Sequence, residues 1–449
     1  MSSLNKFIFK YLVYCPVLLI RREWIFGHLS RLKRSQYYSR KAIEQIQLEK
    51  LNRLLSHARQ TAPYYKGLPA DKLESLADLR NIPFLEKDTL RENAEQLYSN
   101  REGLKPRPKT TGGSTGAAVT LRKSAEGMAQ ELAATWRGYS WAGIDIGDKQ
   151  ARFWGVPHEK KDRLRAKLID FVANRTRLSA FAFSESDFGK YLKNLEKFKP
   201  KYFYGYVSMI RQFAEYIESE GISPSIELVA IITTAEVLTQ SDRETIERVF
   251  GCKVYNEYGC GEVGTIAHEC EFGGLHLTSE NILVELVDDN GNPVSSGEAG
   301  EIVVTDLVNY SMPLIRYKIR DYGEFSEKEC TCGLSLPCLE RVFGREYDYL
   351  VNSRGDRFHG EFFLYIVENL AKSGQTFRGV QFVQYPDLSI VVRLVGKNLD
   401  RDFLKDFFQQ ALTEKMKDVI DVSVELVREI EREHSGKLRV VKRISAPNH

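Results

Sequence analysis

The spacing of apolar residues predicts helices in the first third of the chain. One amphipathic face recurs at intervals of three and four residues. Its members are Ile43, Ile46, Leu51, Leu54, Leu55 and Ala58. We expect this helix to end before Pro63, because proline interrupts a helix. A second long helix is predicted from Ser124 to Trp141.

Short apolar runs in the middle of the chain predict buried strands. Helix-like stretches, such as residues 208–220 and 241–250, separate them. The predicted strands are residues 151–156, 202–205, 228–233 and 253–255. Strands that alternate with helices form βαβ units and a largely parallel sheet. Ligands of such sheets bind beyond the carboxyl ends of the strands.

The pattern changes after Gly273. Three short runs, 275–277, 281–287 and 300–305, are typical of strands, and a turn lies at 289–291. They predict an antiparallel sheet or barrel appended to the α/β body. A small α+β domain should follow. Its predicted elements are a helix at 360–371, a hairpin at 379–385 and 389–395, a helix at 401–416 and a strand at 422–426.

The predicted fold class is therefore α/β, in three parts. Residues 1–45 form an apolar and basic N-terminal extension, and residues 46–345 a large domain with βαβ sheets and the appended antiparallel sheet or barrel. Residues 346–449 form the small α+β C-terminal domain. A chain of 449 residues is too long for one ordinary core, which agrees with several domains.

The composition excludes some classes of function. The chain has 64 Lys and Arg against 61 Asp and Glu, so it lacks the global basic field of a nucleic-acid binder. Seven unevenly spaced cysteines do not form a disulfide framework, and they suit a reducing compartment. We therefore expect a cytoplasmic protein without a nucleic-acid partner.

The amino terminus allows two interpretations. Residues 7–20 are apolar apart from Lys10, but the run is too short to span a membrane, which takes ~20 residues. No small-residue cleavage site of a signal peptide follows it. Seven basic residues and one acid lie between Arg21 and Lys41. Residues 7–41 therefore form either a helix packed on the body or a peripheral contact with the inner face of the membrane.

Polar clusters carry the candidate chemistry, and the first is a loop from Thr110 to Gly116. Its three glycines among hydroxyl residues let backbone N–H groups approach a polyphosphate closely. The loop lacks the lysine of a Walker A motif and does not match G-x-G-x-x-G. A plain surface turn is the alternative.

Two further clusters contain carboxylates. Tyr258-Gly259-Cys260-Gly261-Glu262 follows a predicted strand, where Glu262 can hold Mg²⁺ against phosphate and Tyr258 can stack on a base or line an acyl pocket. The segment Ile315 to Asp321 offers an Asp for both hydroxyls of a ribose. The alternative for Asp321 is an ion pair with Arg320 or Arg316.

The last two clusters lie in or next to the C-terminal domain. Gly344-Arg345-Glu346-Tyr347-Asp348 stands at the predicted domain boundary, where it can act as a hinge. Lys437, after Ser435 and Gly436, can reach out of its domain and neutralise phosphate charge. By itself it would be an ordinary solvated lysine.

In order and spacing these five clusters resemble the adenylate-forming superfamily, and within it the phenylacetate–CoA ligase-like branch. That branch includes deazaflavin-adenylylating synthetases and ligases linked to capsular polysaccharide. The string Ile-Arg-Tyr-Lys-Ile-Arg-Asp at 315–321 is similar to the Ile-Arg-Tyr-Arg-Thr-Arg-Asp of the branch. The resemblance runs from about Leu51 to Ile444.

The resemblance implies an ATP-dependent ligase. It would convert a small carboxylate to an acyl-adenylate, releasing pyrophosphate, and pass the acyl group to an acceptor, with CoA as the first expectation. The alternatives are an amide-forming ligase or a nucleotidyltransferase in polysaccharide or secondary-metabolite synthesis, and, in another class, a non-catalytic membrane-associated scaffold.

It also implies roles for individual residues. The loop would grip the phosphates of ATP, the segment after residue 233 would lie along the adenine, and the small domain would be a mobile lid that turns on Tyr347 or Asp348. The implied catalytic residues are Lys437, Glu262 (with Mg²⁺) and Arg345. The implied nucleotide-binding residues are Thr111, Gly112, Gly113, Ser114, Thr115, Gly116, Ala235, Glu236, Tyr258, Gly259 and Asp321. The loop departs from the family pattern, because residues 117–119 are Ala-Ala-Val where Pro-Lys is common.

Cysteines also predict a structural zinc site. Four thiolates, or three and a histidine, complete a tetrahedral site, and some members of the branch carry similar Cys-x-Cys-Gly elements. The predicted ligands are Cys270, Cys330, Cys332 and Cys338, with His276 or His268 as a substitute. The alternative is reduced thiols on two surface loops. Cys252 and Cys260 are expected to be buried small apolar residues.

Overall fold

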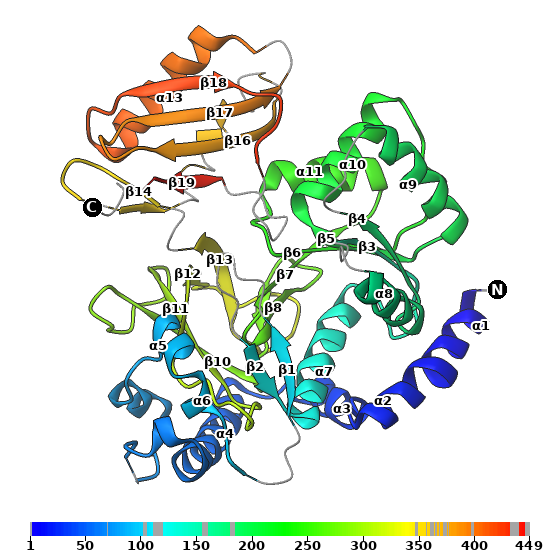
Figure 1. Cartoon of the computed structure of the whole chain (residues 1–449), viewed down its shortest axis with the longest axis vertical. Helices are drawn as coiled ribbons and strands as arrows, with labels where there is room; N and C mark the ends of the chain where they lie inside the picture. The colour runs from blue at the N-terminus through cyan, green and yellow to red at the C-terminus, as the bar shows by residue number, and fades with distance from the viewer. Residues whose placement is uncertain are drawn as a thin grey trace. The chain divides into compact units, whose positions relative to one another are not determined.

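The computed structural model describes two compact units. They are Met1–Leu238 with Glu244–Val342, and Thr239–Arg243 with Phe343–His449 (Figure 1). The described residues are 2–69, 71–101, 106–110, 120–154, 160–179, 185–345, 349–355, 357–359, 363, 366, 367, 369, 370, 375, 377–396, 399–431 and 440–444.

The large unit is built on one mixed sheet of eleven strands. Their order is β10-β11-β12-β13-β9-β8-β7-β6-β5-β3-β4. The bounds are β3 Gln150–Trp154, β4 Arg175–Ser179, β5 Tyr202–Tyr206, β6 Ala230–Thr234, β7 Val254–Cys260, β8 Gly264–Glu269, β9 Leu275–Leu277, β10 Ile282–Val287, β11 Ala299–Asp306, β12 Tyr317–Phe325 and β13 Cys338–Arg345. The strands from β4 to β7 are parallel, and β7 pairs antiparallel with β8. The predicted antiparallel strands thus continue the parallel sheet.

Helices cover both faces of the parallel half (Figure 1). On one face α9 (Glu185–Phe198), α10 (Val207–Ser219) and α11 (Gln240–Phe250) bury a core around Phe213. On the other face α7 (Ala125–Trp141) packs through Tyr139. Helix α8 (Lys160–Val172) leads into β4.

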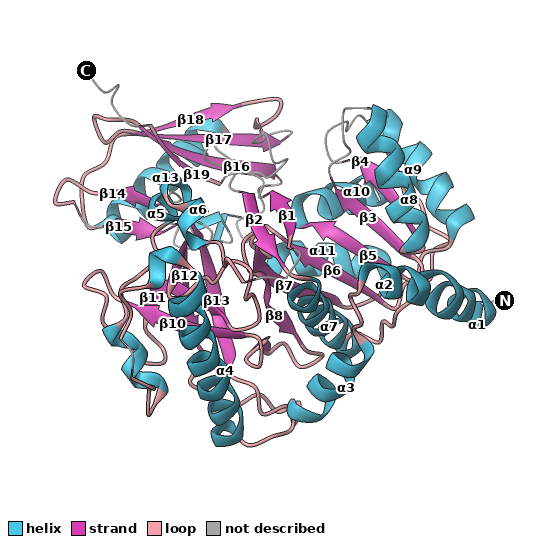
Figure 2. Ribbon diagram, turned by 60° about the horizontal axis from the view of Figure 1, so that its bottom comes forward, coloured by secondary structure: helices cyan, strands magenta, loops and turns pink. Residues whose placement is uncertain are grey.

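The antiparallel half has its own core, in which helix α4 (Arg40–Thr61) packs. This helix confirms the first helix predicted from the sequence. It begins at Ser39, whose hydroxyl accepts the N–H of Ala42. Its apolar face packs with β10, β11 and β12 (Figure 2). The short elements nearby are η2 Pro63–Tyr65, η3 Leu76–Asn81, α5 Lys87–Glu92, α6 Ala94–Leu97, β1 Arg107–Thr110 and β2 Thr120–Lys123.

The N-terminal residues are helical. The elements are α1 Ser2–Phe7, a π-helical η1 Ile8–Tyr14, α2 Cys15–Arg21 and α3 Phe26–Ser35. Helix α3 packs on α7 through a small cluster that includes Leu32 and Ala133. Among the described residues, no helix is both long and apolar enough to cross a bilayer.

The C-terminal unit is a small α+β domain, as predicted. Its sheet has the order β18-β17-β16-β19, with α13 (Arg401–Met416) packed on it through Phe408. The bounds are β14 Tyr349–Val351, β15 Arg357–His359, β16 Phe377–Gln384, β17 Ile390–Gly396, β18 Val422–Leu426 and β19 Val441–Arg443. The predicted helix at 360–371 falls largely outside the described residues.

Candidate active site

The first candidate residues meet between β7 and β12. The hydroxyl of Tyr258 on β7 donates to Oδ2 of Asp321 on β12 at 2.8 Å. The two strands are four places apart in the sheet order, which on a flat sheet would mean about 19 Å. Since the side chains meet, the antiparallel half must curl back over β7, and this curl brings together two motifs that are 63 residues apart.

Glu262 joins this pair from the turn after β7. It is buried, and its Oε1 accepts a long hydrogen bond of 3.4 Å from the hydroxyl of Tyr317, on the same strand as Asp321. Burial, reinforced by the Glu262 carboxylate, raises the pKa of Tyr317, so this tyrosine stays protonated and can only donate to the acid. Tyr258 on β7 and Glu262 in the turn after it thus each contact a residue of β12.

The strand itself differs from the prediction. β7 extends to Cys260, so Tyr258, Gly259 and Cys260 lie within the strand and do not follow it. The reason is the antiparallel pairing with β8, which holds this segment extended. Burial raises the pKa of the Cys260 thiol, which stays neutral, in agreement with its expected structural role.

The ion-pair alternative for Asp321 can be compared with the arginine contacts. Arg316 is buried and pairs with Glu285 at 2.9 Å. Arg320 reaches Asp88 at 3.0 Å. Each guanidinium group thus has a carboxylate partner, and Oδ2 of Asp321 accepts from Tyr258.

A strained turn follows β6, next to β7. Ala235 has φ of +69°, which is rare for a residue other than glycine and is common at functional sites. Glu236 accepts the backbone N–H of Ser208 at 2.7 Å and its hydroxyl at 2.9 Å. Because Ser208 lies in the first turn of α10, Glu236 caps this helix and fixes the turn.

The first bases after the glycine loop, Arg122 and Lys123, are structural. Lys123 is buried and pairs with Glu131 at 2.6 Å and with Asp306 at 3.4 Å. Arg122 lies 3.6 Å from the centre of the Tyr98 ring. These contacts leave Lys123 directed into the core.

A buried polar cluster beside Tyr258 is the feature that the sequence analysis missed. Glu257 accepts a hydrogen bond from Tyr204 at 3.0 Å, and burial raises the pKa of its carboxyl. His268 Nε2 lies 3.8 Å from Glu257 Oε2, and burial lowers its pKa to about 3, so the ring is neutral. The signal in the sequence was a single charged residue inside a strand of otherwise uncharged side chains.

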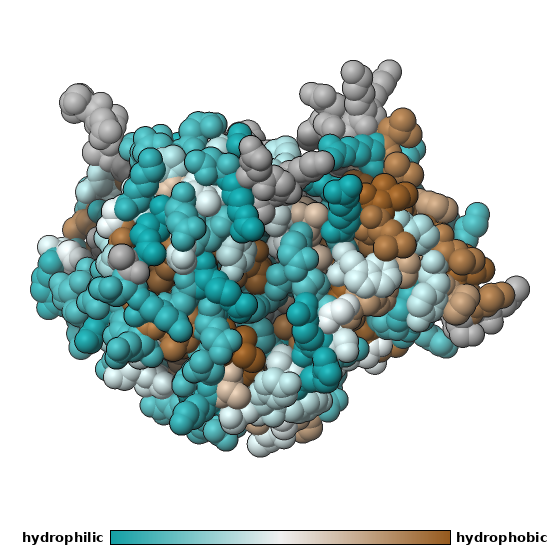
Figure 3. Space-filling view, turned by 90° about the horizontal axis from the view of Figure 1, so that it is seen from below, coloured by the Kyte–Doolittle hydropathy of each residue, from teal (hydrophilic) through white to brown (hydrophobic). Residues whose placement is uncertain are grey.

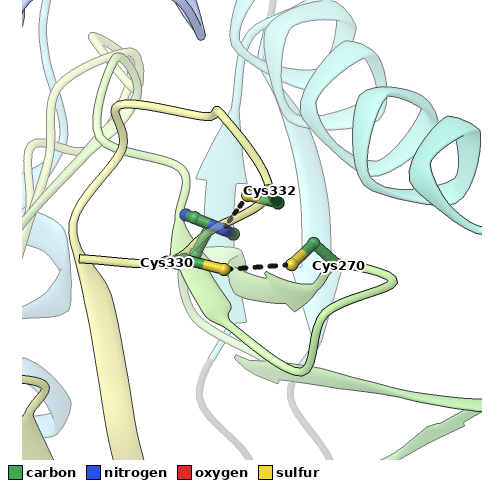
Figure 4. A group of neighbouring side chains, drawn as sticks. Cys270, Cys330 and Cys332 are labelled. Carbon is green, nitrogen blue, oxygen red and sulfur yellow. Dashed lines mark hydrogen bonds between the residues drawn. The ribbon is translucent and has the colours of Figure 1, made fainter. Parts of the chain in front are cut away.

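A second centre lies at β9. Four donor atoms, from Cys270, His276, Cys330 and Cys332, lie within 4.8 Å of one another. The Cys270 and Cys330 sulfurs are 3.6 Å apart, and His276 Nε2 is 3.1 Å from Cys332 (Figure 4). Tetrahedral Zn–S bonds of ~2.3 Å would place two sulfurs about 3.8 Å apart, so the donors fit zinc.

The surroundings also suit a metal. His276 Nδ1 hydrogen-bonds the carbonyl oxygen of Leu336 at 2.9 Å, which leaves Nε2 as the donor atom. The N–H of Leu334 donates to the Cys332 sulfur at 3.4 Å. A Cβ on Gly274 would lie 2.7 Å from the Cys330 sulfur, so only glycine permits this approach.

The other two proposed zinc ligands lie outside this group. The Cys338 sulfur is 3.2 Å from His276 Nδ1, on the side of the ring away from the donor group. His268 belongs to the Glu257 cluster, where it packs on Gly138; a Cβ there would come 2.2 Å from the ring.

The described residues include only part of the predicted site. Arg345 is the last residue of β13, and its side chain is not described. The predicted site residues that lie outside the described residues are Thr111, Gly112, Gly113, Ser114, Thr115, Gly116, Tyr347, Asp348 and Lys437. The described part of the predicted site is therefore Tyr258, Gly259, Glu262 and Asp321, with the Ala235–Glu236 turn after the neighbouring strand β6.

Comparisons with known proteins identify relatives of this chain. A family profile for AMP-binding enzymes matches residues 178–307, and one for the CapK C-terminal domain matches residues 350–444. Protein CapK of Staphylococcus aureus is 26% identical over 316 residues, covering 68% of this chain and 68% of that protein. Phenylacetate-coenzyme A ligase of Thermus thermophilus is 26% identical over 340 residues, covering 70% and 72%.

Solved structures show the same fold. A 2-hydroxyisobutyryl-CoA ligase in the postadenylation state superposes with a TM-score of 0.73, covering 91% of each chain at 19% identity. The same ligase in the thioesterification state, with 2-HIB-AMP and CoA, gives a TM-score of 0.58 at 20% identity.

Proposed function

Because the chain belongs to the phenylacetate–CoA ligase-like branch of the adenylate-forming superfamily, we propose that it is an ATP-dependent acid–CoA ligase. A carboxylate would attack the α-phosphate of ATP to give an acyl-adenylate and pyrophosphate. The thiol of CoA would then take the acyl group and release AMP. The observation that carries the proposal is the hydrogen bond between Tyr258 and Asp321, together with the contact of Glu262 with Tyr317 on the strand that carries Asp321.

The chemistry explains why these side chains belong together. Attack of a carboxylate on a phosphate brings two negative charges together, so the site must position the reactants and offset their repulsion. Asp321 would hold the ribose hydroxyls, with Tyr258 fixing the carboxylate and lying along the base. Glu262 would be a ligand of Mg²⁺, which supplies positive charge next to the phosphates when bound.

The remaining roles extend the proposal. The loop Thr111–Gly116 would bind the β- and γ-phosphates through backbone N–H groups. Lys437 would close on the α-phosphate for adenylation, carried by the C-terminal unit as it turns near Tyr347 or Asp348. The relatives named as phenylacetate-coenzyme A ligases favour CoA as the acceptor over an amine or a sugar.

We also propose that Cys270, His276, Cys330 and Cys332 hold a structural Zn²⁺. The support is the donor geometry, the N–H bond to Cys332 and the space left by Gly274. The zinc would tie the turn before β9 to the loop before β13 and take no part in the reaction.

Separating the two half-reactions tests the function. Pyrophosphate release should be measured with a panel of carboxylic acids, and thioester formation from a supplied acyl-adenylate and CoA. Lys437→Ala should abolish pyrophosphate release and leave thioester formation within about threefold of wild type, because the lysine serves only the charged first step. Equal loss in both half-reactions would contradict the lid role, and no release with any acid would overturn the ligase itself.

A further inference from the structure

The N-terminal helices present an apolar stripe to the outside of the large unit. The stripe consists of large side chains that are between 38% and 81% exposed. They are Leu4, Phe7, Ile8, Tyr11, Leu12, Leu19 and Ile20. The steps of three and four residues place them on one side of a helical run. Figure 3 shows apolar side chains gathered at this end of the molecule.

The polar side of the same run faces inward. Lys6 and Lys10 form ion pairs with Asp145 at 3.2 and 3.0 Å, and Lys6 also reaches Asp148 at 3.4 Å. A Cβ on Gly147 would lie 2.6 Å from the carbonyl oxygen of Lys6, so the helix is seated closely on this loop. A surface helix of a soluble protein normally turns its apolar face to the core. Here Leu18 and Tyr14 pack on the body in the usual way, whereas the turns around Lys6 and Lys10 are held by ion pairs and present apolar side chains outward.

A second helix enlarges the surface. On α8 the exposed apolar residues are Leu164 (72%), Leu168 (65%), Ile169 (44%) and Phe171 (60%). The rings of Phe9 and Phe171 touch, with centroids 5.6 Å apart, which joins the two segments. Two parts of the chain more than 140 residues apart thus build one apolar patch.

The charges around the patch are positive. Residues 1–22 contain no acid. Arg22, Arg165 and Lys167 are exposed beside the apolar side chains. On α8, Asp170 is engaged by Arg175 and Arg177. Trp24, at the end of the run, is 46% exposed, and tryptophan favours the membrane–water interface.

These observations favour a lipid membrane as the partner of the patch. We infer that the patch formed by residues 4–24 and 164–171 docks on an anionic lipid bilayer and lies in its interface without crossing it. Apolar side chains would enter the headgroup and acyl boundary, and the arginines and lysines would contact anionic headgroups. A second copy of the chain fits less well, because a two-fold contact would set two basic rims against each other.

Vesicle binding tests the inference. The full-length protein is sedimented with phosphatidylcholine vesicles, with and without phosphatidylserine. We expect binding to the anionic vesicles, reduced at least tenfold by the combined substitutions Leu12→Ser, Leu19→Ser and Leu168→Ser. The matched control, Val419→Ser, removes a side chain that is 90% exposed on the other unit and should bind as wild type does.

Two further measurements separate the alternatives. The double substitution Arg165→Gln with Lys167→Gln should weaken binding to anionic vesicles by about fivefold per charge. Binding to neutral vesicles should not change. Sedimentation velocity without lipid should give the same mass for wild type and the triple variant. Lipid docking would be overturned if the wild-type protein bound neither type of vesicle, or if the triple variant bound as well as wild type. It would also be overturned if wild type were a dimer without lipid and the three serine substitutions made it a monomer.

Discussion

The bond between Tyr258 and Asp321 permits a quantitative prediction for Asp321→Asn. The carboxylate accepts the tyrosine hydroxyl at 2.8 Å and, in the proposed role, both hydroxyls of the ribose. A hydrogen bond to a charged group contributes about 1.5–3 kcal/mol, and asparagine keeps one acceptor oxygen. A net loss of roughly 3 kcal/mol corresponds to about 150-fold in kcat/KM for ATP.

The assay is steady-state pyrophosphate release with ATP varied at saturating acid. Tyr258→Phe should cost about tenfold in the wild-type background and much less in Asp321→Asn, because the two changes remove one shared bond. Asp289→Asn makes the same chemical change on an exposed turn and should have no effect. Wild type should discriminate against 2′,3′-dideoxy-ATP, and Asp321→Asn should lose that discrimination. Equal preference in both enzymes would refute the ribose role.

Three other predictions follow from the structure. Glu262→Gln should raise the Mg²⁺ concentration for half-maximal activity at least tenfold; an unchanged Mg²⁺ curve would count against it as a ligand. Gly274→Ala should lower the zinc content from about one per chain, because its Cβ would crowd the Cys330 sulfur. The control Gly67→Ala places a Cβ in open space and should leave the zinc content unchanged. Metal analysis of both purified variants tests this prediction. Burial raises the pKa of Glu257, so the folded state keeps a proton that the unfolded state loses, and stability should fall as pH rises from about 4.5. Glu257→Gln should flatten the decline of Tm with pH, and parallel curves would contradict this.

Continuous apolar runs made the centre of the fold predictable. β5 and β6 are buried at every position, so periodicity and composition both indicated them. β4 was missed because Arg175 and Arg177 alternate with small and apolar residues inside a basic run, and their charge is matched by Asp170 only in the folded chain. An edge strand of this kind has no apolar run for a sequence pattern to detect.

The candidate site was predictable where its residues form a local motif. It was unpredictable where several residues were equally good candidates and only the folded structure distinguishes them. The spacing of cysteines indicated a metal cluster, but it could not rank Cys338 against His276. Their ranking depends on the pairing of β13 with β9, which sets Cys338 directly opposite His276 and turns only the ring nitrogen Nε2 toward the other donors. The Glu257 cluster likewise depends on which side of β7 faces α7.

The Cys/His cluster has a mechanical consequence for the C-terminal unit. β13 begins at Cys338, opposite a cluster residue on β9, and the chain passes into the second unit at Phe343. A metal that joins the segments preceding β9 and β13 would fix the strand that leads into the second unit. Any rotation between half-reactions would then pivot on the few bonds beyond the anchored strand, which would make its axis repeatable.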